Sequence, residues 1–280
     1  MKKPESFWGA ASRILSDRVC TFSRLCRKAA TRASADNIHD VRVSSRRLAA
    51  ALDVFDLDEL AGLKKDAARI RKKIGKIRDL DIAIGNIRDF SETLDAGDRQ
   101  ECENIAAKLH RKRQRWLCQV RPLLRCSIPM PHLVLLEEES AAFGDEAPVH
   151  LRPLLAAASE LLDRITSTDN ARPLHLLRIC VKRLRYKIEI FASSIELEVD
   201  GWLTSCKELQ DRLGEVHDLD ILIELIEEEW KEGLQGGPCR GGIERLLQEA
   251  WRKRHRLSSG LLASLSEEAA FLERIRSSLF

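Results

Sequence analysis

The sequence predicts an all-α protein, and three observations support this fold class. Apolar residues recur with a period near 3.6 along almost the whole chain, which gives a helix one buried face. Leu, Ala, Arg, Glu and Lys, all of them good helix formers, dominate the composition. Only 5% of the 280 residues are aromatic, fewer than a β-sandwich or barrel of this length usually contains. The 14 Gly and 8 Pro residues are too few for a fibrous or disordered chain.

We expect eight helices, and local signals set some of their limits. Asp36 is suited to cap the second helix, and Pro173 suits the first turn of the sixth. The stretch 127–149 contains several Pro and Gly residues and is expected to be the main linker, with four helices on each side. The expected helices cover residues 5–33, 37–55, 58–92, 98–125, 151–168, 173–195, 199–232 and 243–278.

The two halves of the chain repeat each other. HDVRVSSRRL (39–48) matches HLLRICVKRL (175–184) after 136 residues, GKIRDLDI (75–82) matches GEVHDLDI (214–221) after 139, and RKRQR (111–115) matches RKRHR (252–256) after 141. Three matches in the same order indicate an internal duplication. The sequence therefore predicts one domain over residues 1–280, built from two similar helical halves at 1–127 and 149–280.

Basic residues form a strip along one helix of each half. The first strip comprises His39, Arg42 and Arg46, and its counterpart comprises His175, Arg178, Lys182 and Arg185. At about 100° per residue, the members of the first strip fall within about 60° of one another. Apolar residues such as Val43 and Val54 border this strip on its flank. We therefore expect the strips to lie in a groove and to be only partly solvated.

Two segments are rich in cations and contain no acidic residue. Segment 172–187 holds six Lys or Arg residues, and segment 108–125 holds seven, although the net charge of the chain is only +3. Such rows are not salt-bridge ladders, and in a fold their mutual repulsion costs stability. A bound polyanion would relieve that cost, and Arg matches a phosphate edge with two donors. The alternative is that these cations are solvated and that their alkyl stems cover the core.

The repeated elements resemble the conserved histidine α-helical domain, or CHAD, family. The resemblance rests on the HxxRxxx[RK]RL elements that begin at His39 and His175, on the element from Arg78 to Asp81, and on the Arg-rich fourth helix of each half. It covers nearly the whole chain. It implies two four-helix bundles with a basic groove or central pore that bind inorganic polyphosphate without catalytic activity. Polyphosphate-metabolising proteins as partners and targeting to polyphosphate granules are further expectations.

The resemblance also implies a set of ligand-binding residues. These are His39, Arg42, Arg46, Arg47, Arg111, Lys112, Arg113, Arg115, His175, Arg178, Lys182, Arg183, Arg185, Arg252, Arg254 and Arg256. The chain departs from the family pattern in two places. Ala49 occupies the position that matches Arg185, and His217 occupies the position that matches Arg78. These departures put equal contributions from the two halves in question.

Two aspartates follow one another at alternate positions in each half. They are Asp79 and Asp81 in the first half and Asp218 and Asp220 in the second. Alternate positions on a helix direct two carboxylates to different sides, which is poor geometry for a metal. We therefore expect these residues to orient the Arg strips or to cap helices, and we expect no metal and no cofactor. The two strip histidines have a similar alternative, in which each orients the groove through a hydrogen bond.

Other classes of protein find less support. The chain lacks GxxxxGK, GxGxxG and HExxH, and the ExExK pattern at 227–231 lies in a predicted helix rather than a strand. The HD dipeptides at 39–40 and 217–218 do not occupy matching positions of the repeat, because Leu176 follows His175 and His217 matches Arg78. We therefore expect no enzymatic activity. An RNA or DNA module that binds the phosphate backbone remains the main alternative, although Tyr186 and Trp116 are the only rings in the basic segments. A third class is a scaffold whose acidic segment 224–232, with Trp230, contacts a partner.

The expected location is a reducing cytoplasm. The eight cysteines show no zinc-ligand spacing, and the first residues contain no apolar run typical of a signal peptide. No stretch approaches the roughly 20 apolar residues needed to cross a bilayer. We expect most cysteines to be small core residues and expect no membrane partner.

Overall fold

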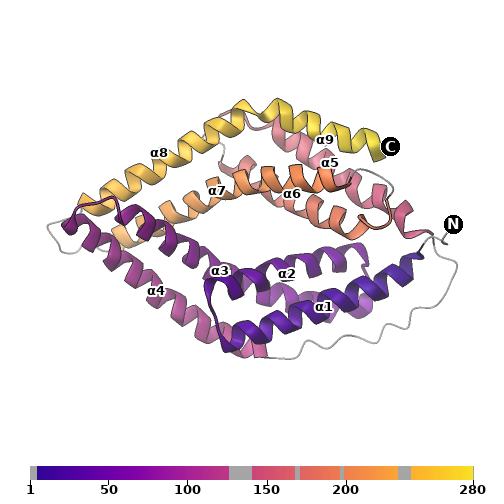
Figure 1. Cartoon of the computed structure of the whole chain (residues 1–280), viewed down its shortest axis with the longest axis horizontal. Helices are drawn as coiled ribbons and strands as arrows, with labels where there is room; N and C mark the ends of the chain where they lie inside the picture. Colours follow the sequence, from indigo (N-terminus) through magenta and orange to yellow (C-terminus); the bar gives the residue numbers. More distant parts are fainter. Residues whose placement is uncertain (1–4, 126–140, 168–170, 196–198, 233–240, 280) are drawn as a thin grey trace.

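The computed structural model describes residues 5–125, 141–167, 171–195, 199–232 and 241–279, and these residues are helical almost throughout (Figure 1). Within them there is no β-strand, apart from a single bridge between Ser6 and Ala142. The predicted all-α fold class is therefore confirmed. The elements are α1 (Phe7–Thr31), α2 (Ala35–Val54), η1 (Asp58–Leu60), α3 (Ala61–Ser91), α4 (Ala96–Arg125), η2 (Phe143–Glu146), α5 (Ala147–Asp163), α6 (Ala171–Phe191), α7 (Val199–Glu232), α8 (Gly241–Ala263) and α9 (Leu265–Leu279).

Most helix limits lie within a few residues of the expected ones, but the expected cap of the second helix and the expected single last helix were wrong. The N-cap of α2 is Ser34, whose hydroxyl oxygen accepts a hydrogen bond from the Asn37 amide, so Asp36 lies inside the first turn. The expected last helix is two helices, because the chain turns at Ser264. Ser264 is followed three residues later by Glu267, a spacing that is typical of a helix start.

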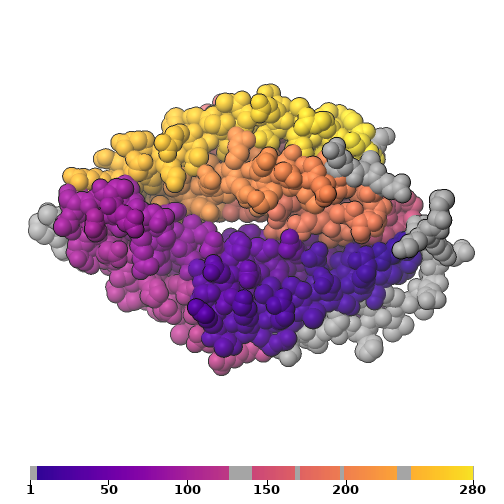
Figure 2. Space-filling model, viewed as in Figure 1, coloured from indigo at the N-terminus to yellow at the C-terminus, as the bar shows by residue number. Residues whose placement is uncertain are grey.

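The helices form two groups that lie against each other. In each group neighbours along the chain pack together, α1 to α4 in one group and α5 to α9 in the other. The groups meet through the pairs α2–α6, α3–α7 and α4–α8. In Figure 1, α4 and α8 converge at one end of the molecule, and α2 and α6 face each other across its middle. Figure 2 shows a gap between the two groups near the centre of the molecule.

The hydrophobic core does not divide along the two halves. One cluster of buried residues draws on α1, α2 and α3 and also on α5, α6, α7 and α9. A second cluster lies where the distal ends of α3 and α4 pack against α7 and α8, with Ile87, Ala106 and Ile226 fully buried in it. Burial of apolar side chains is the main stabilising term in such a fold. The two halves are therefore held together by shared cores rather than by a surface contact.

The end of the expected linker belongs to the core. Residues 126–140 lie outside the described part of the chain, but Phe143 stacks between Phe55 and Phe191, with ring centroids 5.7 and 4.7 Å apart respectively. Phe55 and Phe191 lie just beyond the two basic strips, at the C-terminal ends of α2 and α6. Phe143 therefore packs these two helix ends together. The neighbouring Gly144 has no room for a Cβ, which would collide with the carbonyl oxygen of Ser194.

Four of the six described cysteines are buried, namely Cys26, Cys102, Cys180 and Cys206. Burial raises the pKa of Cys26 and of Cys206 to about 12, so these thiols stay protonated near neutral pH. Among the described helices, none combines the length and the apolar character needed to cross a membrane.

Candidate functional site

The middle of the molecule holds four basic residues that face one another across the contact between α2 and α6. They are Arg42 and Arg46 on α2 and Arg178 and Lys182 on α6, and we call them the central cluster. All four line two cavities, a larger one and a smaller one. The strips expected from the sequence are thus brought together at these four positions.

The larger cavity has a volume of about 620 Å³ and is strongly cationic. Its wall contains eight Lys or Arg side chains and one carboxylate, that of Asp53. Besides the central cluster, the cations are Lys64, Arg71, Arg183 and Lys187. Four alanines also line the wall, and their small side chains leave the space open. One of them is Ala49, so the missing basic side chain in the first strip contributes to the volume of the cavity.

The smaller cavity, of about 390 Å³, has a mixed lining. In addition to the central cluster it has one further cation, Arg78, and three carboxylates, those of Asp211, Glu215 and Asp218. A polyanion therefore meets repulsion from the carboxylates of α7 in the smaller cavity and little repulsion in the larger one. The two cavities differ in charge although they share the same four cations.

The aspartates that open the Asp-x-Asp elements hold the arginines of the central cluster. Nη1 of Arg42 donates to Oδ1 of Asp79 at 2.7 Å and to the carbonyl oxygen of Gly75 at 3.0 Å. In the second half, Nη2 of Arg178 lies 3.8 Å from Oδ1 of Asp218. Burial raises the pKa of Asp218 despite this neighbour. The same positions of the sequence repeat thus form an ion pair in both halves, at hydrogen-bond distance in the first half only.

Arg46 and Lys182 differ from these arginines, because neither forms an ion pair with a carboxylate among the described residues. Lys182 is only 8% exposed. Burial, together with the guanidinium groups of Arg46, Arg178 and Arg42, lowers the pKa of Lys182 to about 6. Burial and Arg42 lower the pKa of Arg46 to about 10. The site therefore holds crowded positive charge that a bound anion would stabilise.

The strip histidines occupy two different settings. His39 lines the smaller cavity, where partial desolvation and the nearby Arg78 lower its pKa although its surface remains largely open to solvent. His175 lines the larger cavity, where its Nδ1 lies 3.3 Å from Nδ1 of His217. Burial lowers the pKa of His217 to about 3, so the imidazole is neutral at neutral pH. Replacement of the Arg78 equivalent by His217 thus removes a charge from the second half.

The fourth-helix arginines do not reach the central cavities. Arg113, which is 7% exposed, donates to Asp81 of α3 and to the carbonyl oxygen of Ala33. Arg254 donates to Asp220 of α7 at 2.8 Å. The second aspartate of each Asp-x-Asp element therefore pairs with the fourth helix rather than with the strip. The remaining predicted members Arg111, Lys112, Arg115, Arg252 and Arg256 line neither central cavity.

Of three other predicted residues of α2 and α6, one lines a central cavity and two do not. Arg183 is exposed and lines the larger cavity. Arg47 lines neither central cavity, and its Nε donates to Glu189 at 2.8 Å. Arg185 also lies away from both cavities, with its guanidinium 4.8 Å from the ring centroid of Tyr186 and 3.9 Å from Glu189. The expected fourth member of the second strip is therefore not part of the central site.

Sequence reasoning missed several residues of the larger cavity. Lys64 and Arg71 come from α3, and Lys187 and Tyr186 come from the end of the α6 strip. The signal for the α3 residues was present, because residues 61–78 hold eight Lys or Arg residues and a single acid. Lys64 and Arg71 precede the repeated element at 75–82, so the repeat does not indicate them.

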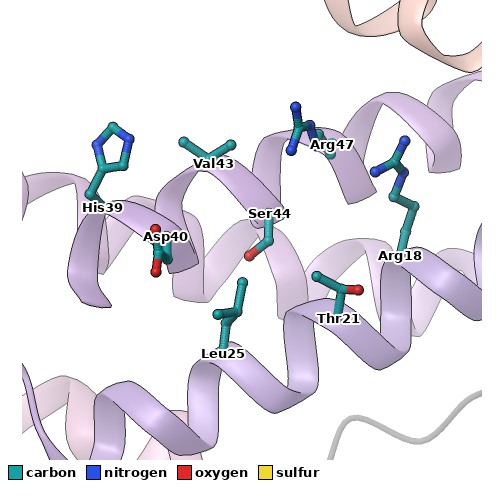
Figure 3. A pocket seen from close by; sticks show the side chains of 8 residues that line it. All are labelled: Arg18, Thr21, Leu25, His39, Asp40, Val43, Ser44 and Arg47. Atoms are coloured by element: carbon teal, nitrogen blue, oxygen red, sulfur yellow. The ribbon is translucent and has the colours of Figure 1, made fainter. Parts of the chain in front are cut away.

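A third cavity, of about 320 Å³, lies between α1 and α2 (Figure 3). Figure 3 shows the guanidinium groups of Arg18 and Arg47 extending in the same direction from these two helices. Asp40 also lines the cavity, and Arg47 is already bound to Glu189. The cavity thus has little net positive charge compared with the central site. Among the described residues, no group of three His, Cys, Asp or Glu side chains is arranged to hold a metal ion.

The fold and the central cluster together define a helical domain in which the repeated HxxRxxx[RK]RL elements of the two halves converge on one site, and a family match agrees with them. The CHAD domain family model matches residues 21–227, which is well over half of the chain. The protein therefore belongs to the CHAD domain family, and the resemblance seen in the sequence is confirmed.

Two solved structures are similar over nearly the whole chain. The crystal structure of the CHAD domain from the plant Ricinus communis is 22% identical, with a TM-score of 0.61, and the match covers 100% of this chain and 93% of that one. PptA from Streptomyces chartreusis is 15% identical, with a TM-score of 0.57, and the match covers 96% and 99% respectively. Comparison with curated protein sequences gives no match. At these identities the likeness shows the fold.

Proposed function

We propose that the protein binds inorganic polyphosphate at the central cluster and in the larger cavity, and that it acts as a binding protein rather than as an enzyme. The observation that carries this proposal is the charge of the larger cavity, where eight Lys or Arg side chains face one carboxylate. A linear polyphosphate has a negative charge on every unit, so successive phosphates meet successive cations. Arg42, Arg46 and Arg178 supply planar donors that match phosphate oxygens in pairs.

Two features favour polyphosphate over RNA or DNA. Tyr186 is the only Phe, Tyr or Trp that lines the larger cavity, and it is 4% exposed, so its face is not open for stacking with a base. The cavity wall contains no Asn or Gln that would contact base edges. The site therefore offers charge without base recognition. The family resemblance of the sequence motifs supports the same ligand.

The acidic end of α7 gives less support to a scaffold that uses this face. Glu228 forms an ion pair with Lys112 of α4, and Glu229 forms one with Lys108 of the same helix. Part of the acidic segment is therefore neutralised within the fold. Association with polyphosphate-metabolising proteins and with polyphosphate granules in the cytoplasm remains part of the proposal. It would follow from binding of the polymer itself.

A competition assay tests the proposed ligand. Long-chain polyphosphate, single-stranded RNA and duplex DNA are compared at matched phosphate concentration and at two salt concentrations. We expect the tightest binding to polyphosphate, and a steep loss of affinity at the higher salt because counterions are released on binding. Tighter binding to RNA or DNA would overturn the proposal.

The absence of enzymatic activity has its own test. The protein is incubated with polyphosphate, ATP or inorganic triphosphate in the presence of a divalent metal, and released phosphate is measured. We expect no release above that of a heat-denatured sample. Reproducible release would show that the protein is an enzyme.

A further inference from the structure

The outer face of α3 carries a line of cations outside both central cavities. Lys65, Arg69, Lys72 and Lys76 are all exposed, and we call them the outer stripe. Their spacing places successive members roughly 5–6 Å apart on one face of the helix. In the described part of the chain, none of the four forms an ion pair with a carboxylate; the Lys76 ammonium lies 4.2 Å from the centroid of the Trp116 ring. The outer stripe is thus a row of unneutralised charge.

The outer stripe borders the larger cavity. Lys64, Ala68 and Arg71 of the same helix line the cavity wall. At about 100° per residue, Lys65 and Lys72 each lie next to these residues around the helix, on the side turned away from the cavity. A linear anion that leaves the cavity past Lys64 and Arg71 would therefore meet the outer stripe next. The stripe spans roughly 16 Å along α3.

The equivalent face of α7 has the opposite charge. An offset of 139 residues relates Gly75 to Gly214 in the sequence repeat. By this offset the four members of the stripe correspond to Thr204, Glu208, Asp211 and Glu215 of α7. These residues are also exposed, and Asp211 and Glu215 line the smaller cavity. A polyanion is attracted on the α3 side of the molecule and repelled on the α7 side. The repeat therefore provides two matching helices, of which only one suits a polyanion.

We propose that the outer stripe is a second polyphosphate-binding surface, which holds the part of a long chain that extends out of the larger cavity. This inference rests on the proposed function of the central site. Short chains occupy the central cluster and the cavity alone, whereas long chains also neutralise the stripe. Affinity per molecule and its salt dependence therefore increase with chain length beyond what the cavity accommodates.

The test combines two ligands with two matched variants. The stripe variant carries Lys65→Gln, Arg69→Gln and Lys72→Gln, and leaves Lys76 on its Trp116 contact. The control variant carries Arg24→Gln, Arg27→Gln and Lys28→Gln, which removes the same charge from exposed residues of α1. Binding of tripolyphosphate and of long-chain polyphosphate is measured over a range of salt concentrations, and circular dichroism and thermal unfolding check that both variants are folded.

We expect the stripe variant to bind long-chain polyphosphate roughly tenfold more weakly than the wild type, and its salt slope to fall by about 2, since three phosphate contacts are lost. Its affinity for tripolyphosphate should equal that of the control variant. Equal losses for long chains in the stripe and control variants would overturn this inference while leaving the central site intact. Failure of the wild type to bind either ligand would instead overturn the proposed function. Single-stranded RNA is measured with the same proteins as an additional comparison, and a loss that appears with RNA and not with polyphosphate would assign the stripe to nucleic acid and refute the inference.

Discussion

The two halves of the chain hold their framework arginines in the same way, but they leave different charges available to a ligand. Arg113 pairs with Asp81 in the first half, and Arg254 pairs with Asp220 in the second. Beyond these contacts the halves diverge, because the first half has the basic face of α3 and the second has the acidic face of α7. The comparison separates two roles of arginine. Arginines such as Arg113 and Arg254, which are buried in ion pairs between helices, fix the positions of those helices, whereas the cations that line the central cavities are available to an anion.

The largest expected effect comes from breaking a framework pair. Arg113→Ala leaves Asp81 as a buried carboxylate without its partner, since the side chains of both residues are 8% exposed. We expect the free energy of unfolding to fall by about 3–5 kcal/mol, measured by urea denaturation. Arg111→Ala removes an exposed arginine of the same helix and should change the free energy of unfolding by no more than about 0.5 kcal/mol. Equal stabilities of the two variants would show that the pair has no framework role.

The next largest effect should come from reversing charge in the central cluster. The double variant Arg46→Glu/Lys182→Glu places two carboxylates where the proposed ligand binds, and we expect affinity for polyphosphate to fall at least roughly 100-fold. Arg185, the last member of the second strip, lies away from both central cavities, so reversal of its charge should have a smaller effect.

The matched control for this variant is Arg252→Glu/Arg256→Glu, which reverses two exposed charges of α8. Because solvent and salt screen these positions, its affinity should change by less than about threefold. Circular dichroism establishes that both double variants stay helical. A comparable loss in both would mean that net charge, rather than the central cluster, governs binding.

The smallest effect concerns pH. Without ligand, the pKa of Lys182 is about 6, and a bound polyanion raises it by stabilising the ammonium form. The complex therefore holds one proton more than the free protein above pH 6, and affinity should fall as pH rises, by up to about tenfold per pH unit until the pKa of the complex is reached. The groups facing Lys182 are Arg42 and Arg46 of α2, Arg178 and His175 of α6, and His217 and Asp218 of α7.

Titration calorimetry in buffers of different ionisation enthalpy measures this proton uptake directly. The variant Lys182→Arg keeps its charge to a much higher pH, so its affinity should be nearly independent of pH between 6 and 8. If the wild type takes up no proton in this range, Lys182 is either charged before binding or remote from the ligand.

Much of this protein can be predicted from local sequence patterns. Apolar periodicity predicted the helical class, and the repeated motifs predicted both the family and the four residues of the central cluster. These inferences succeed because a helix face is defined by residues three and four positions apart. The turn at Ser264 was missed because its cap signal lies inside a continuous apolar pattern. In the structure this turn is held by a contact between helices, in which Arg212 of α7 donates to the Ser264 hydroxyl oxygen.

Only the tertiary structure decided which of the cations are neutralised. Arg111 and Arg113 belong to one basic cluster, two positions apart, yet Arg113 is buried against Asp81 and Arg111 is exposed. Residues two positions apart point to different sides of a helix, and the partner of Arg113 is supplied by α3, 32 residues away in the chain. The sequence by itself therefore determined where the charges are, whereas the packing of α3 on α4 and of α2 on α6 determined which of them remain for a ligand.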